Sequence, residues 1–115
     1  MNKDIENICP LTYAMELISS KWRLPIIWAL NQNKIMRYNE LKRNVEGITN
    51  MMLSQCLKEM ESVGMIIRKQ YMEIPPRVEY SLTQEGESLI PALEALHKWG
   101  SNMKSINVKK IQKIY

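Results

Sequence analysis

Apolar residues recur at helical spacing through the first half of this chain. The segment before residue 65 is therefore predicted to hold four helices, over residues 5–18, 22–30, 38–45 and 50–63. The second of these is apolar on nearly all sides, which is typical of a central, buried helix. The stretch between the second and third helices, residues 35–37, is long enough only for a small edge strand.

The helix over residues 50–63 has two different faces. Its apolar stripe, which would dock on a core, is formed by Leu53, Leu57 and Met60. Its other face is mostly short or hydrogen-bonding and carries Met51, Ser54, Gln55, Lys58 and Ser62. Thr49 or Asn50 is expected to cap its start by accepting a hydrogen bond from a free backbone N–H. Gly64 is expected to end it in a left-handed conformation.

After Gly64 the apolar positions alternate instead, which predicts strands over residues 65–71 and 77–82. The tip between these two strands contains the paired prolines Pro75 and Pro76, which cannot join the backbone hydrogen bonds of a sheet. Beyond the second strand, Thr83 is expected to cap a last, long helix that Pro91 kinks.

Two short helices joined by a turn containing glycine form a helix-turn-helix, and a hairpin directly after it makes a winged helix. We therefore predict a fold that is mainly α with a small β-hairpin. It forms one domain over residues 1–115. Its parts are the helix-turn-helix at about 38–63, the wing at about 65–83 and a C-terminal helix at about 84–105.

The first and last helices carry more apolar residues than one small domain readily covers. We therefore expect them to act as N- and C-terminal dimerisation helices that pair across a two-fold axis. The residues expected at this homodimer interface are Ile5, Ile8, Met15, Leu89, Leu93, Leu96, Trp99 and Met103.

Composition narrows the class of partner. Sixteen basic against twelve acidic residues give a formal charge of +4, which mildly favours a polyanion. No apolar run approaches the ~20 residues that a membrane span needs, so no membrane partner is expected. The first ten residues lack the apolar core of a signal peptide. Two distant cysteines then indicate reduced thiols, and we expect a cytoplasmic protein.

The motifs of common enzymes are missing from the sequence. It has no phosphate-binding glycine loop, no HExxH, no nucleophile elbow and a single histidine. That residue, His97, adjoins no cysteine or acidic cluster, so neither a metal site nor a cofactor is expected. The remaining rival is a winged helix that serves only as a protein-interaction module. It would carry acids on the helix face and wing, where this chain has Lys58, Lys69 and Arg77.

Four segments carry a specific resemblance to a known family. They are CPLTYAMELISSKW (9–22), RYNELKR (37–43), GITNMMLSQCLKEME (47–61) and YMEIPPRVEYSLTQEG (71–86). With them the chain resembles the HxlR-type winged-helix transcriptional regulators, relatives of the MarR group, over nearly all of residues 9–100. The resemblance implies a homodimer on a palindromic operator, often controlled by electrophiles, oxidants or small molecules. Cys56 departs from the pattern, because relatives usually carry a basic residue there.

The helix face and wing supply the residues expected to touch double-stranded DNA. Contacts with base edges are predicted for Asn50, Met51, Ser54 and Gln55, and Lys58 is expected on a phosphate or guanine. The wing carries Lys69 and Arg77, whose cations can reach the minor groove or its phosphates. Arg37 and Lys42 flank the first helix of the motif and are expected to contact the DNA backbone or water rather than bases. Thr49, at the start of the second helix, completes the candidates for DNA binding. The alternative, that these side chains are only solvated, is less favoured beside a wing.

Cys9 directly precedes Pro10 at a predicted helix start. Free N–H groups and the helix dipole there favour a thiolate. The resemblance implies a sensing cysteine at this position, so Cys9 is the candidate redox sensor. An inert thiol is an equally open interpretation from the residues alone. Cys56 borders the apolar stripe and is expected to be a small core residue.

Overall fold

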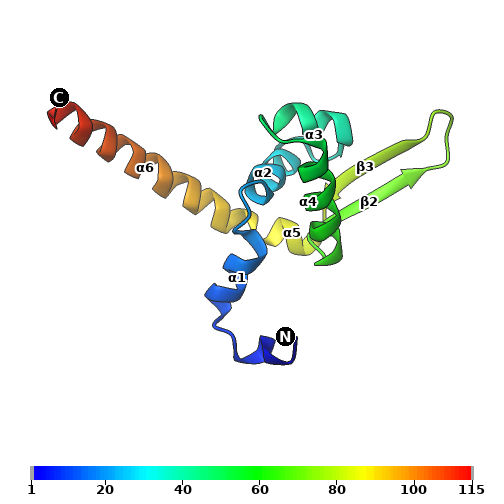
Figure 1. The fold of residues 1–115 in the computed structure, drawn as a ribbon, viewed down its shortest axis with the longest axis horizontal. Helices are drawn as coiled ribbons and strands as arrows, with labels where there is room; N and C mark the ends of the chain where they lie inside the picture. The colour runs from blue at the N-terminus through cyan, green and yellow to red at the C-terminus, as the bar shows by residue number, and fades with distance from the viewer. Residues whose placement is uncertain (1, 115) are drawn as a thin grey trace.

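The structure, a computed structural model, describes residues 2–114. Its helices are η1 (Asn2–Asn7), α1 (Pro10–Ile18), α2 (Arg23–Asn33), α3 (Tyr38–Asn44), α4 (Asn50–Ser62), α5 (Gln84–Ser88) and α6 (Ile90–Ile114). Its strands are β1 (Met36–Arg37), β2 (Ile66–Tyr71) and β3 (Arg77–Leu82). The predicted winged helix is confirmed, with α3 and α4 as the helix-turn-helix and β2 and β3 as the wing (Figure 1).

The core forms where α2, α4 and the sheet meet. Ile26, Ile27 and Leu30 of α2 are almost completely buried, as expected for a helix with apolar residues on nearly all sides. Leu53 and Met60 bring α4 onto the same cluster. Burial of this apolar surface fixes α4 against the domain and leaves its opposite face in solvent.

The three strands form one antiparallel sheet in the order β1-β3-β2. The small edge strand predicted near residue 36 is confirmed, since Met36 pairs with Tyr80 of β3. At the far end of the hairpin, Tyr71 pairs with Arg77. The wing extends away from the helical body at this end (Figure 1).

The first helix is shorter than the prediction. It begins at Pro10, whereas Ile5 lies in the 3-10 helix η1 and Ile8 lies between the two. The residue before a proline is driven out of the helical region by contact with the proline ring. Cys9 accordingly adopts φ −53° and ψ 130°, so η1 and α1 cannot form one helix.

The last helix is broken rather than kinked. Thr83 caps α5 as predicted, accepting a hydrogen bond from the Gly86 N–H at 3.0 Å. Pro91 has no N–H to continue the ladder of α5, and a new helix starts beside it at Ile90. From there α6 runs to Ile114, well past the predicted end near residue 105.

Two of the predicted interface leucines belong to the core of their own domain. Leu93 is only 6% exposed, and Leu89 packs against the same cluster. Both lie in the first part of the C-terminal segment, where it crosses the body of the domain. Leu93 therefore serves the core of its own domain, whereas Leu89 stays partly exposed and its place in an interface stays a prediction.

The molecule is elongated, because α6 and α1 project from the body (Figure 1). The Cα radius of gyration is 17.1 Å, compared with about 13 Å expected for a compact domain of this length. No residue of α1 is buried. Of the helices in residues 2–114, none is both long and apolar enough to cross a membrane.

Candidate nucleic-acid interface

The outer face of α4 is open to solvent over its whole length. Met51 is 79% exposed, and Ser54, Gln55 and Lys58 are exposed with it. The predicted cap is present, since Thr49 Oγ1 accepts a hydrogen bond from the Met52 N–H at 3.1 Å. Thr49 therefore fixes the first turn of the helix, the part that enters a major groove in helix-turn-helix proteins.

The inner face of α4 is fully used by packing. The predicted stripe of Leu53, Leu57 and Met60 is buried, and Cys56 is buried beside it as a small core residue. Cys56 is therefore a core residue, as its place beside the apolar stripe predicted, and it contributes nothing to the outer face.

Tyr38 links the two helices of the motif, and it was not among the site residues predicted from the sequence. Its ring packs against the core. Its hydroxyl lies 2.9 Å from the backbone oxygen of Asn50, 3.3 Å from Asn50 Oδ1 and 3.1 Å from Ser54 Oγ. The apolar spacing of α3 explained the ring of Tyr38 and gave no information about its hydroxyl.

A groove of ≈ 400 Å³ separates α4 from the wing. Its lining residues are Tyr38, Ser54, Leu57, Lys58, Glu61, Arg68 and Tyr80. The groove therefore contains two cations, three hydroxyls and one carboxylate. Its net positive charge and its hydrogen-bond donors favour the binding of a phosphate group. Arg68 is the second residue that the sequence analysis missed. Its position was predictable, because period-2 alternation places Arg68 on the same face of β2 as buried Ile66.

Arg77 is held by neighbours within the wing. Its guanidinium lies 3.4 Å from both the Glu73 and the Glu79 carboxylates and 3.9 Å from the centre of the Tyr71 ring. Arg77 therefore has a structural role within the wing, and its contact with DNA stays a prediction. It ties β2 to β3 across the hairpin, and its charge is already compensated. Lys69 lies on the same face, 5.0 Å from the Tyr71 ring, and remains exposed.

The other predicted contact residues are spread more widely. Arg37 caps α3 and is exposed, with its backbone N–H bonded to Glu40 Oε1 at 2.8 Å. Lys42 lies in the last turn of α3 and is half-buried. Gln55 borders a second hollow next to Ser20 and Trp22, on the side of α4 away from the wing. The structure thus brings Ser54 and Lys58 of α4 close to the wing. Gln55 lies on the other side of α4, Arg37 lies in β1 and Lys42 lies in α3.

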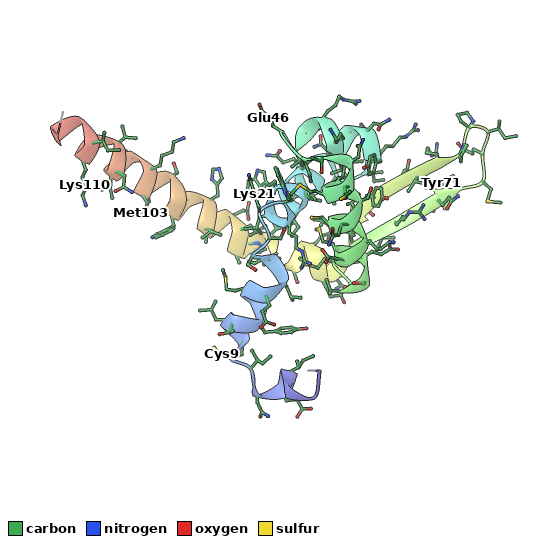
Figure 2. All side chains as sticks on the ribbon, viewed as in Figure 1. Cys9, Lys21, Glu46, Tyr71, Met103 and Lys110 are labelled. Carbon is green, nitrogen blue, oxygen red and sulfur yellow. The ribbon has the colours of Figure 1, made fainter. Side chains whose placement is uncertain are left out.

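Cys9 lies at the start of α1, far from α4 and the wing (Figure 2). Its thiol is fully exposed. Hydrogen bonds from the backbone N–H groups of Thr12 and Leu11 lower the pKa of the Cys9 thiol below its usual value. The helix start therefore stabilises a thiolate, as the sequence predicted.

An exposed, capped helix beside a β-hairpin, with a cation-lined groove between them, defines the winged helix-turn-helix class of nucleic-acid-binding proteins. Comparison with known proteins gives the family. A sequence model of the HxlR-like helix-turn-helix family matches residues 17–107, and the chain belongs to that family. It is a helix-turn-helix transcriptional regulator rather than an enzyme.

The similar proteins include relatives matched by sequence and regulators with solved structures. The proposed regulatory protein MalR of Fusobacterium mortiferum is 46% identical over 92 residues, covering 80% of this chain and 87% of MalR. The redox regulator HypR in its reduced form is 32% identical, with a TM-score of 0.80 and coverage of 85% of this chain and 96% of that one. The reduced form of the transcriptional regulator YodB from Bacillus subtilis is 29% identical, with a TM-score of 0.72 and coverage of 80% and 90%.

Proposed function

We propose that this regulator acts in the cytoplasm as a homodimer on a palindromic DNA operator. Each α4 would enter a major groove, and each wing would lie along the adjacent backbone. The observation that carries this proposal is the exposed outer face of α4, which carries Met51, Ser54, Gln55 and Lys58. Ser54 and Lys58 also line the groove that holds Arg68. Amide and hydroxyl groups there can bond to base edges, and the cations can bind phosphates.

The homodimer is supported by apolar surface on α1 and α6 that this chain leaves uncovered. Leu11 of α1 is 71% exposed and Trp99 of α6 is 61% exposed. Further large apolar side chains are exposed at Met15, Leu96, Ile106, Val108 and Ile111. A second copy that covered both helices would also account for the extended shape of the single chain.

Binding of a protein partner by the wing and α4 is the competing function. It is less well supported, because Glu59 of α4 pairs with Arg23 at 3.4 Å and Glu73 of the wing pairs with Arg77. Two of the acids that could attract a basic partner are thus already compensated within the chain.

Selection from a pool of random DNA duplexes separates the two functions. The wild-type protein is expected to enrich a two-fold symmetric sequence whose half-sites lie ~34–36 Å apart, one helical turn. Recovery of unselected sequences would favour the protein-interaction function instead. The most enriched duplex then serves as the probe for every variant below.

We further propose that Cys9 is the residue through which oxidants or electrophiles control binding. Its exposed, thiolate-stabilising position supports this, as does the similarity to HypR, a redox regulator. A modification at the start of α1 would act on one of the two proposed dimerisation helices. Small relative movements of two subunits suffice to misplace a pair of reading helices.

Diamide is expected to weaken duplex binding by the wild-type protein and to leave Cys9→Ser unaffected. At pH 7 the lowered pKa also predicts that iodoacetamide modifies Cys9 faster than buried Cys56, because the thiolate is the reactive form. The measurements are duplex affinity with and without diamide, and mass spectrometry of the alkylated protein. An equal diamide response in Cys9→Ser would move the sensing site elsewhere, including to a small-molecule effector.

A further inference from the structure

The hydroxyl of Tyr38 is placed to control one of the base-reading groups. Tyr38 is the first residue of α3, and its ring is anchored against the core. Its hydroxyl reaches the start of α4, where it meets the backbone oxygen and side chain of Asn50 and the Oγ of Ser54. All three contacts lie in the first turns of the helix that enters the groove in the proposed complex.

Counting protons fixes the direction of these hydrogen bonds. A tyrosine hydroxyl has one proton to donate and lone pairs that accept. The shortest contact, 2.9 Å, is to the Asn50 backbone oxygen, which can only accept. The Tyr38 proton is therefore used there, with Asn50 Oδ1 at 3.3 Å as the weaker branch of the same bond. At 3.1 Å, Ser54 must then donate its own proton to Tyr38.

This direction determines what Ser54 offers to DNA. With its proton directed at Tyr38, the exposed Ser54 hydroxyl presents only lone pairs to an incoming base edge. In the major groove, adenine and cytosine present an exocyclic amino group that donates, whereas the O6 of guanine and the O4 of thymine only accept. An unrestrained serine would bond to either kind of edge.

We propose that Tyr38 is a positioning residue that makes Ser54 an acceptor, so that Ser54 selects adenine or cytosine at one position of each half-site. The inference rests on the proposed function, since it requires α4 to read a major groove. Tyr38 itself acts through Ser54 and Asn50.

The test compares Tyr38→Phe with the wild-type protein on the duplex enriched by the wild type and on its three single-base-pair variants at each half-site position. Phenylalanine keeps the ring that packs on the core and removes only the oxygen. Tyr38→Phe is expected to lower affinity for the enriched duplex about three- to tenfold, the size of one net hydrogen bond. At the position read by Ser54, it should also reduce the preference for adenine or cytosine over guanine or thymine by a similar factor.

Ser54→Ala identifies that position, because it should lose the preference there. The double variant should show the same base preference at that position as Ser54→Ala, since both changes remove the Tyr38–Ser54 hydrogen bond. In contrast, Tyr38→Phe and Gln55→Ala should add, because Gln55 lies on the other side of α4. Ser88→Ala in α5 is the control for loss of an exposed hydroxyl away from α4 and the proposed dimer helices, and it should bind as the wild type does.

Three results would overturn the proposal. They are an unchanged base preference in Tyr38→Phe, an equal loss of affinity for all sequences, and a preference for guanine or thymine at the position read by Ser54. The second is what a purely structural role of the hydroxyl would give. Failure of the wild-type protein to enrich any sequence is a separate outcome that removes the proposed function and this inference together.

Discussion

Replacing Trp99 with glutamate should convert the protein to a monomer and lower its affinity for the enriched duplex by ~10²–10⁴-fold. Trp99 is 61% exposed in the single chain, so a charge there costs the monomer little. In the proposed dimer it would be buried against a second copy, where an unpaired carboxylate is strongly unfavourable. Separated subunits would then bind each half-site independently and lose the advantage of linkage. Analytical ultracentrifugation and a duplex titration measure the two effects.

Ile35→Glu is the matched control for this variant. Ile35 is 56% exposed, similar to Trp99, and lies at the end of α2 rather than on α1 or α6. It should sediment as the wild-type protein does. A wild-type protein that sediments as a monomer at micromolar concentration and still binds the symmetric duplex would refute the dimer.

Salt should weaken duplex binding steeply. A dimer that makes about 6–10 phosphate contacts loses ~10³–10⁵ in affinity between about 50 and 200 mM salt, because bound cations release counterions from DNA. The cations placed for such contacts are Lys58 and Arg68 at the groove, with Lys69 on the wing. Each occurs twice in the proposed dimer.

Two substitutions distinguish the exposed cations from the compensated one. Lys58→Gln should reduce the slope of log affinity against log salt by about two, one contact for each subunit. Arg77→Gln should change the slope less, because Glu73 and Glu79 already balance its charge. A shallow slope for the wild-type protein, or a larger effect of Arg77→Gln, would contradict this assignment of contacts.

Local signals in the sequence were sufficient for most of the fold. Thr49 caps α4, and Gly64 follows it with φ 84°, as the residue types at these positions predicted. Alternation along β3 correctly placed Tyr80 and Leu82 on the buried face. Each of these features depends on neighbours within a few residues, which is why the chain itself reveals them.

The errors at the first and last helices have one cause, which is the local constraint that proline places on the backbone. Apolar spacing favoured a continuous helix through Ile8 and past Pro91. The restricted backbone of Cys9 before Pro10, and the N–H that Pro91 lacks, separated the helices instead.

Most residues of the candidate site could be predicted from the sequence, but the contacts that they make could not. Lys58, Ser54 and Gln55 could be assigned to the outer face of α4 by counting along the helix. The ion pairs of Arg77 depend on the register of the hairpin, and the hydroxyl of Tyr38 depends on how α3 packs on α4. Both require distances between segments that sequence patterns do not provide.

The ratio of affinities for two duplexes tests most directly whether α4 reads sequence. One duplex carries the enriched site, and the other carries the same bases in scrambled order, at one fixed, physiological salt concentration. If the exposed face of α4 reads base edges in two successive major grooves, the enriched site should bind about 10³–10⁷-fold more tightly. Equal affinities would mean that the protein contacts only phosphates, and the proposal that α4 reads the base sequence would be wrong.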